Sequence, residues 1–390
     1  MKNNNNIRVL QVITKYINYG GEVAIAEYER EQLKKNGFIV DQFNLDNKKL
    51  FNNKLYAIYV LFNLGRNQYT KNTLKKKLAS FKPHIVHIYS YFPQFPLSLL
   101  KVISKNKVKI VMTLSNYRLV CSNGYLFTNQ NLCFDCLKKK KYSPILKKCY
   151  RSSFLLSFLA SRDIFNNWEK NIVNKYVDKF FCMHEFSKNI HTQYGIDNKK
   201  ITIKNNQIAN NFIKKINYYS KKNFGLFIGR NSPEKGIEFL INAWTGIQYQ
   251  LILLGDIKNN LISQNHYILN AGFMNDKKKY EYFMEANFLV FPSLWHEAGT
   301  PLVILEALAS GLPVICANIQ PMNDIIRHNY NGLLYEYNDI EDLKSKIKIL
   351  ISNNKLQNQL SKNATKSYRE RFSNMHSEEI LINEYESLII

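Results

Sequence analysis

Short apolar runs of strand length alternate with amphipathic stretches along the chain, and the alternation starts again in the second half. Parallel strands joined by helices give this pattern, which is typical of a doubly wound α/β fold. At 390 residues the chain is long enough for two domains of about 150–200 residues each. We therefore predict two Rossmann-like domains that face a central cleft at the carboxyl ends of their sheets. The expected strands lie at residues 7–14, 38–45, 84–90, 109–115, 180–184 and 200–206, and then at 223–230, 249–256, 267–273, 288–293 and 313–318.

A polar segment rich in Asn and Lys, at about residues 206–222, marks the expected boundary between the halves. We assign residues 1–205 to an N-terminal domain with a cysteine-containing insertion at about 121–151. Residues 206–372 form the expected C-terminal domain. Residues 373–390 are predicted to form a helix that packs back on the N-terminal domain.

The chain carries 54 Lys and Arg against 30 Asp and Glu, a net charge of +24. Such an excess indicates anionic partners, and it is concentrated at residues 71–83 and 136–151. Solvated lysine-rich faces and a patch that docks on an anionic membrane leaflet both fit the pattern. Nucleic acid fits less well, because no helix-turn-helix, RNA-recognition or zinc-finger spacing accompanies the charge. We expect no nucleic-acid partner.

The N-terminal apolar run is too short for a secretory signal, and no stretch reaches about 18 uninterrupted apolar residues. These observations predict a cytoplasmic protein, with the basic first half as its route to the inner membrane surface.

The stretch "WHEAGTPLVILEALASGLPVI" (residues 295–315) places a carboxylate, Glu306, on an otherwise apolar helix. A buried carboxylate needs hydrogen-bond donors, which either the protein or a ligand must supply. Pro301 suits the start of this helix, and Gly311 suits its end. The helix N-terminus would then lie at the carboxyl edge of the second sheet, where its free N–H groups bind anions.

A second motif, "GRNSPEKG" (residues 229–236), follows the first strand of the same domain. Arg230 and Lys235 in it are suited to a diphosphate. The motif is not a Walker loop. By itself it fits an ordinary turn and helix cap, and Glu306 by itself fits a structural carboxylate. Together, at one sheet edge, they favour a nucleotide site in which Glu306 binds the neighbouring hydroxyls of a ribose.

These two motifs resemble those of the retaining glycosyltransferases of family 4, which have the two-Rossmann GT-B fold. The resemblance extends to "YGGEVAIAEY", "IVHIYS", "TLSNYRLVCSNG", "ITIKNNQI", "LLGD" and "NGLLYEYND". It implies transfer of a sugar from a nucleotide-diphosphate sugar, UDP- or GDP-linked, to an acceptor bound by the N-terminal domain. The expected acceptor is a lipid-linked saccharide in O-antigen, capsule or exopolysaccharide synthesis. The chemistry it implies is a front-face mechanism in which the leaving phosphate takes the acceptor's proton, with no cofactor required.

The resemblance also assigns roles to residues. Glu306 would hold the ribose hydroxyls, Arg230 and Lys235 the diphosphate, and Glu297 the donor sugar. Gly20 and Gly21 would form a turn that lets backbone approach the donor phosphates or the acceptor. The remaining expected donor-binding residues lie in the loop before the helix that carries Glu306 and at the start of that helix: Gly299, Thr300, Leu302 and Val303.

The sequence departs from the family pattern at two places. Eight residues separate Glu297 from Glu306, where the family usually has seven. Ser115 stands where members with this segment commonly have a histidine facing the donor sugar, so we treat it as a candidate catalytic residue together with Glu297. His87 lies nearby and is better explained as a structural histidine. Both departures leave open a catalytically weakened sugar-nucleotide-binding or scaffold protein.

Four of the six cysteines lie within 29 residues, at Cys121, Cys133, Cys136 and Cys149. A Cys-x2-Cys pair flanked by two further thiols is suited to tetrahedral zinc, whereas disulfides are rare in the cytoplasm. Either a structural zinc ion or four unligated thiols in a loop-rich insertion fits this spacing.

Overall fold

The computed structural model describes residues 7–15, 21–47, 60, 62–63, 67–208, 212, 221–257 and 265–389. The chain divides into two compact units, each built on its own six-stranded sheet. The first unit comprises Met1–Asn129, Cys133–Gln207 and Asn374–Ile390, and the second comprises Gln130–Leu132 and Ile208–Ser373. The predicted class, two Rossmann-like α/β domains, is confirmed.

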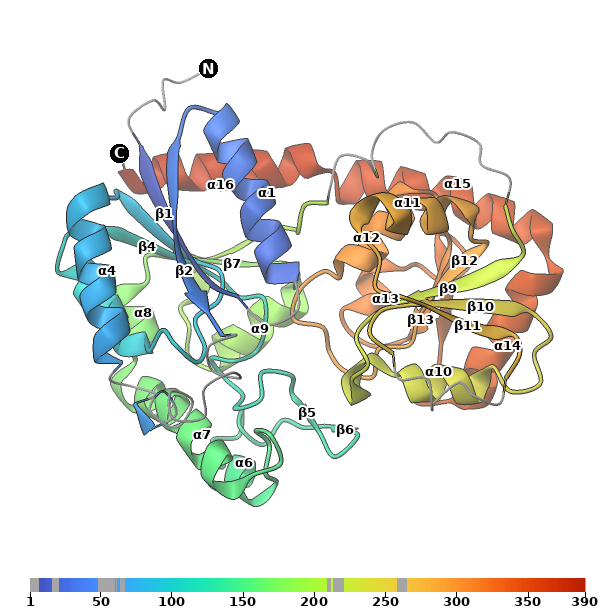
Figure 1. Ribbon diagram of the computed structural model, residues 1–390, viewed down its shortest axis with the longest axis horizontal. Helices are drawn as coiled ribbons and strands as arrows, with labels where there is room; N and C mark the ends of the chain where they lie inside the picture. The colour runs from blue at the N-terminus through green and yellow to red at the C-terminus, as the bar shows by residue number, and fades with distance from the viewer. Residues whose placement is uncertain are drawn as a thin grey trace. The chain divides into compact units, whose positions relative to one another are not determined.

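The first sheet has the strand order β2-β1-β3-β4-β7-β8, and all its neighbouring strands are parallel (Figure 1). Its strands are β1 (Arg8–Lys15), β2 (Ile39–Asp46), β3 (Ile85–Ile88), β4 (Lys109–Thr113), β7 (Lys179–Cys182) and β8 (Ile201–Ile203). The two short strands β5 (Phe127–Thr128) and β6 (Asn131–Leu132) pair with each other. The helices of the unit are α1 (Gly21–Lys35), α4 (Gln68–Phe81), η1 (Leu97–Leu99), α5 (Leu100–Ser104), α6 (Ser143–Leu146), α7 (Phe154–Lys170), α8 (Ile172–Tyr176), α9 (Glu185–Gln193), η2 (Asn198–Lys200) and α16 (Asn374–Ile389).

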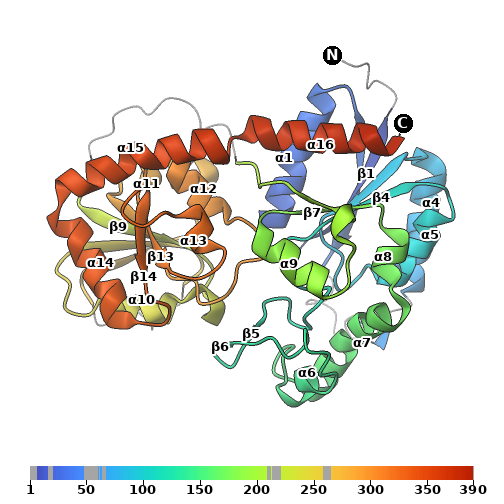
Figure 2. The ribbon, with the colours of Figure 1, turned by 180° about the vertical axis from the view of Figure 1, so that it is seen from behind.

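Helix α16 completes the core of the first unit although it follows the whole second unit in sequence (Figure 2). Its Leu381 and Tyr385 are fully buried in a cluster with Leu33 of α1 and Val9 of β1. The Tyr385 hydroxyl also lies 2.6 Å from Nδ1 of His87. The first sheet therefore depends on residues from both ends of the sequence.

The second sheet has the order β11-β10-β9-β12-β13-β14, again all parallel. Numbered along the chain this is 3-2-1-4-5-6, the Rossmann order, whose direction reverses between β9 and β12. Its strands are β9 (Phe224–Ile228), β10 (Gln250–Leu254), β11 (Ile268–Gly272), β12 (Phe288–Phe291), β13 (Val314–Ala317) and β14 (Gly332–Tyr335). Its helices are η4 (Pro233–Lys235), α10 (Ile237–Ala243), α11 (Asp276–Glu285), α12 (Leu302–Ala309), α13 (Met322–Ile325), α14 (Ile340–Ser352) and α15 (Asn354–Arg371).

Strand β12 shows why this sheet is buried on both faces. Phe288 and Val290 pack in one hydrophobic cluster, while the intervening Leu289 and Phe291 pack in the other. Side chains alternate across a strand, so an unbroken apolar run requires a helix layer on each side. The sequence run 288–293 therefore predicts a central parallel strand.

Several expected elements differ in their bounds. Strands β3 and β4 end two residues before the predicted ends, which puts Ser115 in the loop after β4. Helix α7 ends at Asn171, whose φ of 49° is left-handed, and α8 begins directly after it. No helix in the described ranges has both the length and the apolarity to cross a membrane.

A buried ion pair lies inside the first unit. Lys204 Nζ is 2.5 Å from Glu29 Oε1, and the two side chains are 2% and 0% exposed. The second oxygen of Glu29 accepts a hydrogen bond of 2.6 Å from the Tyr89 hydroxyl. Both oxygens of the carboxylate are therefore satisfied, which is what allows the charge to be buried.

Substitution of Lys204 by Met should lower the free energy of unfolding by about 3–5 kcal/mol, because Glu29 would remain buried without its counter-charge. Lys141→Met is the matched control, since its partner Glu169 is exposed and such pairs contribute about 0–1 kcal/mol. Urea unfolding followed by circular dichroism measures both. Equal losses in the two variants would contradict the prediction.

Candidate nucleotide-sugar site

The candidate site lies in the second unit, at the point where the strand order reverses. The segment after β9 holds the motif at residues 229–236, and the segment after β12 leads through residues 292–301 into α12. Ligands of open α/β sheets bind outside the carboxyl ends of the strands at such a reversal. The two motifs are thus brought together by the order of the strands.

Gly236 explains how closely the two segments approach. Its φ of 68° is left-handed, and an added Cβ would lie 2.0 Å from the carbonyl oxygen of Pro292. Only glycine fits both conditions. Nearby, Leu294 N donates to Glu234 O across the same junction.

Glu306 lies in the second turn of α12 and is 4% exposed. Its Oε1 accepts a hydrogen bond of 2.7 Å from Lys279 Nζ. Its Oε2 is buried and has no hydrogen-bond partner among the described residues. The protein therefore satisfies half of this carboxylate and leaves the other half for a donor from elsewhere.

Lys279 is a site residue that the motifs do not reveal. It is carried by α11, which follows β11, and it also pairs with Asp276 at 3.2 Å. Burial alone would lower its pKa, but the carboxylates of Glu306 and Asp276 raise it, so the ammonium stays charged. In the sequence it is one of three consecutive lysines, and nothing there distinguishes it from Lys277 and Lys278.

Burial raises the pKa of Glu306 to about 7, and the nearby Lys279 opposes that rise. The carboxyl would therefore be close to half ionised near neutral pH. Hydroxyl groups that donate to Oε2 would favour the ionised form.

Glu297 accepts three hydrogen bonds at Oε1. The donors are Lys235 Nζ at 2.5 Å, Ser293 Oγ at 2.8 Å and Trp295 Nε1 at 2.9 Å. Lys235 also lies 5.5 Å from the ring centroids of Phe291 and Trp295. The structure thus brings together Glu297 and Lys235, which the sequence analysis assigned to different parts of the donor.

Arg230 is the more exposed cation of the first motif, with 58% of its side chain accessible. Its Nη2 lies 3.1 Å from Glu234 Oε1, and Ser232 Oγ donates to the same oxygen at 2.7 Å. Glu234 is buried and fixes the turn, while the guanidinium remains accessible to an anion.

The start of α12 presents backbone donors. Pro301 occupies the cap position, one residue before the helix, and its carbonyl accepts from the N–H groups of Ile304 and Leu305. The N–H groups of Leu302 and Val303 have no carbonyl acceptor within the helix, as at any helix N-terminus. Thr300 is buried and Gly299 half-buried in the preceding loop. These four residues remain predicted donor contacts.

A separate polar cluster lies in the first unit. Ser115 Oγ donates to Glu22 Oε1 at 2.7 Å, and Asn116 Nδ2 donates to the same oxygen at 2.8 Å. Glu22 is in the first turn of α1, directly after Gly21, whereas Gly20 lies outside the described residues. Glu22 is not among the residues that the sequence motifs indicate, although its place directly after two glycines is a usable signal.

His87 is fully buried, and both of its ring nitrogens have partners. Nε2 lies 2.7 Å from Thr113 Oγ1, and Nδ1 lies next to Tyr385. Burial, with help from Lys204, holds its pKa well below the usual value. This is a neutral structural histidine, and it does not substitute for a base at Ser115.

The contacts between cysteines of the insertion do not follow the Cys133-x2-Cys136 spacing, because Cys136 contacts Cys121. The thiols of Cys121 and Cys136 share a hydrogen bond, which lowers the pKa of Cys121 to about 6. Cys149 lies close enough to Cys121 and Cys133 for their charges to interact. In the described part of the chain, no three His, Cys, Asp or Glu side chains are arranged to hold a metal ion. A structural zinc ion therefore stays a prediction.

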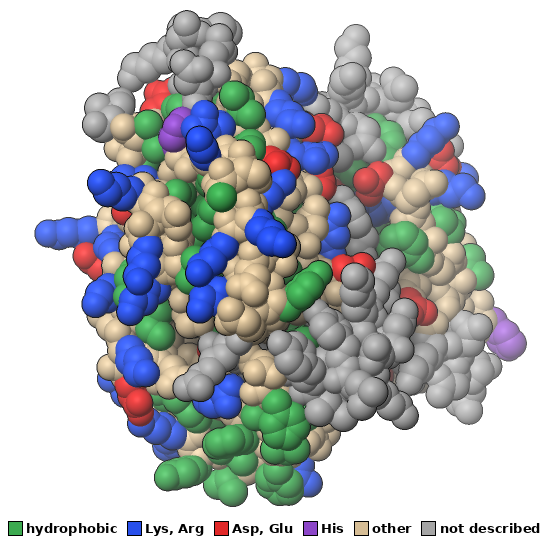
Figure 3. Space-filling model, turned by 60° about the vertical axis from the view of Figure 1, so that its left-hand side comes forward, with side chains coloured by type: hydrophobic (Ala, Val, Ile, Leu, Met, Phe, Trp, Pro, Cys, Tyr) green, Lys and Arg blue, Asp and Glu red, His purple; other side chains and the backbone are tan. Residues whose placement is uncertain are grey.

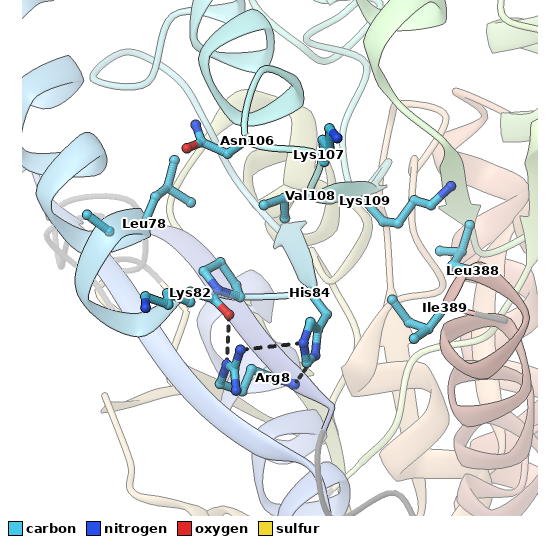
Figure 4. A pocket seen from close by; sticks show the side chains of 12 residues that line it. Arg8, Leu78, Lys82, His84, Asn106, Lys107, Val108, Lys109, Leu388 and Ile389 are labelled. Carbon is cyan, nitrogen blue, oxygen red and sulfur yellow. Dashed lines mark hydrogen bonds between the residues drawn. The ribbon is translucent and has the colours of Figure 1, made fainter.

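The first unit has a hollow of about 660 Å³ at the amino ends of its strands, where β1 and β4 begin (Figure 4). Arg8 Nε donates to the carbonyl of Lys82, and Arg8 Nη2 lies 3.4 Å from His84 Nε2. Lys107 and Lys109 add further cations. The described residues that line it include no Asp or Glu, so it lacks the buried carboxylate that distinguishes the candidate site.

Part of this chain is similar to a known protein family. Residues 209–367 match the family model of glycosyl transferases group 1. An uncharacterised glycosyltransferase of Methanocaldococcus jannaschii is 32% identical over 50% of this chain and 56% of its own length. The chain thus spans little more than half of that relative.

Two further comparisons cover more of the chain. The Escherichia coli UDP-Gal:alpha-D-GlcNAc-diphosphoundecaprenol alpha-1,3-galactosyltransferase is 26% identical over 68% of this chain and 72% of its own length. The crystal structure of Anabaena HepE in complex with UDP and glucose has a TM-score of 0.68 at 15% identity, covering 98% of this chain and 100% of that one. The fold is GT-B.

The raised pKa of Glu306 gives a pH prediction for the ligand-free protein. Its folded-state pKa lies above the unfolded value of 4.5, so its contribution is most favourable at low pH and is lost as pH rises through 7. The stability of the wild type relative to Glu306→Gln should fall by about 3 kcal/mol between pH 4.5 and pH 8. Urea unfolding across this range measures the difference. Glu281→Gln, an exposed site on α11, should show no such trend, and a flat difference for Glu306→Gln would contradict the assignment.

Proposed function

We propose that this protein is a retaining glycosyltransferase that transfers a sugar from a UDP- or GDP-sugar to a lipid-linked saccharide. The single observation that carries the proposal is the unsatisfied Oε2 of Glu306, beside an Oε1 already bound to Lys279. A carboxylate with one free, buried oxygen at the carboxyl edge of a Rossmann sheet is suited to the hydroxyls of a ribose. The match to group 1 glycosyl transferases over residues 209–367 supports this choice.

The diphosphate would lie between Glu306 and the first motif. Arg230, Lys235 and the N–H groups at the start of α12 are the groups that would stabilise the negative charge that develops on the leaving nucleoside diphosphate. Lys235 is held by Glu297 in the structure, so a diphosphate would compete with that carboxylate for the ammonium. The hydrogen bonds from Ser293 and Trp295 would keep Glu297 in place beside the donor sugar.

The acceptor proposal rests on the relatives and on the charge of the chain. The E. coli relative acts, by its name, on a diphosphoundecaprenol-linked sugar. A net charge of +24 suits an acceptor that carries phosphates at an anionic membrane surface. We place the protein in the cytoplasm, peripheral to the inner membrane, in O-antigen, capsule or exopolysaccharide synthesis.

A catalytically weakened sugar-nucleotide-binding or scaffold protein is the second candidate. Ser115 favours it, because the hydroxyl donates to Glu22 and is no base at neutral pH. A front-face mechanism, in which the leaving phosphate takes the acceptor's proton, needs no base at this position. The two candidates differ in turnover and not in nucleotide binding.

The first experiment is thermal stabilisation by UDP, GDP, ADP and CMP, with wild type and Glu306→Ala. At 100 times Kd one nucleoside diphosphate should stabilise the wild type by about 2.7 kcal/mol. The variant should lose this effect, and Glu281→Ala on the exposed face of α11 should keep it. Stabilisation retained in Glu306→Ala would show that the ribose assignment is wrong.

Donor turnover then separates the two candidates. Hydrolysis or transfer of a matching nucleotide sugar, measured by release of the nucleoside diphosphate, is expected for the enzyme. If the protein binds nucleotide but releases no nucleoside diphosphate from any of the donors, the scaffold is favoured.

Lys279→Met should weaken nucleotide binding at least tenfold, because Glu306 would lose the cation that keeps it ionised.

We also propose that Cys121, Cys133, Cys136 and Cys149 hold a structural zinc ion. The contact of Cys121 with Cys136 and the closeness of Cys149 to Cys121 and Cys133 support it. Elemental analysis of protein purified without chelator should give about one zinc per chain, lost in Cys136→Ser but retained in the control Cys316→Ser. The proposal would be overturned if the purified protein contained no zinc and were as stable as protein supplied with zinc.

A further inference from the structure

Five large apolar side chains are exposed on one short part of the first unit. They belong to α6, the residue before it, and the start of α7: Tyr142 at 77% exposure, Leu146 at 72%, Leu155 at 55%, Phe154 at 52% and Phe158 at 48%. Other exposed apolar side chains occur on the chain, such as Phe273 and Met375, but these five come from one stretch of 17 residues, and contiguous apolar surface of this kind commonly marks an interaction site. We call these five residues the α6–α7 face.

The exposure follows from the periodicity of α7. Phe154, Leu155 and Phe158 lie within an arc of about 100° on one side of the helix. The opposite side carries Ala160 and Ile164, which are buried in the unit. Helix α7 is therefore apolar on two sides, and only one of them faces the core.

Cations surround the α6–α7 face and acids are absent from its sequence. No Asp or Glu occurs between Cys136 and Arg162. Lys148 Nζ lies 4.4 Å from the ring centroid of Phe154, which places a charge directly beside the apolar surface. The cations of this segment are Lys138, Lys139, Lys140, Lys141, Lys147, Lys148, Arg151 and Arg162.

The nearest acids are already paired with some of these lysines. Asp135 binds Lys147 at 2.8 Å and lies 3.7 Å from Lys140, and Glu169 lies 2.7 Å from Lys141. The net charge around the face is strongly positive. Figure 3 shows hydrophobic side chains gathered at the lower end of the molecule, with Lys and Arg side chains beside and above them.

We propose that the α6–α7 face is the surface with which this protein docks on an anionic lipid bilayer. The aromatic and leucine side chains enter the boundary between headgroups and acyl chains, and the lysines and Arg151 bind the anionic headgroups. The inference deepens the proposed function by naming the membrane contact, and its purpose rests on that function. Exposed apolar groups with a strongly cationic rim complement a negatively charged lipid surface more closely than they do an average protein surface, which carries both signs in similar amounts.

The test measures binding to vesicles and uses neither donor nor acceptor, so its failure is distinguishable from failure of the proposed function. Co-sedimentation with vesicles of neutral phosphatidylcholine alone, and with one third anionic phosphatidylglycerol, gives partition coefficients at two salt concentrations. The variant combines Leu146→Ser, Phe154→Ser and Leu155→Ser. We expect binding to the anionic vesicles at low salt, weaker binding at high salt, and at least a tenfold loss in the variant.

Two control variants keep the result specific. Ile349→Ser removes an exposed apolar side chain from α14 in the second unit, and it should bind vesicles as the wild type does. Lys82→Gln with Lys107→Gln removes two cations from the hollow at the other edge of the first sheet. The partition coefficient of this double variant should fall less than threefold if the α6–α7 face, and not the total charge, directs docking.

A second measurement tests the proposal even if the triple variant fails to fold. In a Phe154→Trp variant, lipids brominated near the headgroup should quench the fluorescence of the new tryptophan. The quenching should exceed any quenching of the wild type. Equal binding of the wild type to neutral and anionic vesicles, no binding to either, or no extra quenching would overturn the proposal. Dimerisation of the wild type that the triple substitution abolishes, without lipid binding, would assign the face to a second copy and overturn it as well.

Discussion

A buried carboxylate must have both of its oxygens satisfied, and this requirement organises both halves of the molecule. Each unit contains a buried Lys–Glu pair. In the first unit Glu29 is bound at one oxygen by Lys204 and at the other by Tyr89. In the second unit Lys279 binds Oε1 of Glu306, and the described residues supply no partner for Oε2. The first pair is complete among the described residues, whereas the second leaves one buried oxygen open to a further donor.

The cations of the candidate site are all held by the protein's own acids in the absence of a ligand. Arg230 contacts Glu234, Lys235 contacts Glu297, and Lys279 contacts Glu306. The charges of these three pairs therefore balance one another within the candidate site. A diphosphate would draw Arg230 and Lys235 away from acids that retain other hydrogen bonds, so neither Glu234 nor Glu297 would be left without donors. Such an exchange of partners avoids exposing an uncompensated buried charge.

Strand and helix alternation predicted the six strands of the first sheet and five of the second, because apolar runs such as 288–293 are buried on two faces and leave a strong pattern. The edge strand β14 was missed, since its apolar run is only a few residues long. The motif around Glu306 was likewise readable, since an acid on an otherwise apolar helix needs an explanation. Lys279 and Glu22 were not readable in this way. Lys279 lies in a run of three lysines, and only the packing of α11 selects the one that turns inward. The pairing of Lys235 with Glu297 also depends on the approach of two segments 62 positions apart in sequence.

The second unit is inserted, in sequence, between the two parts of the first. Gln207 Nε2 donates to the carbonyl of Asn374 at 3.0 Å, so the chain leaves the first unit and returns to it at neighbouring points. During synthesis on the ribosome the second unit is therefore finished before the first has received Leu381 and Tyr385. The sheet that carries His87 must wait for these residues with part of its apolar surface uncovered. The nascent first unit is thus the part of this protein with the longest exposure to aggregation and to chaperones.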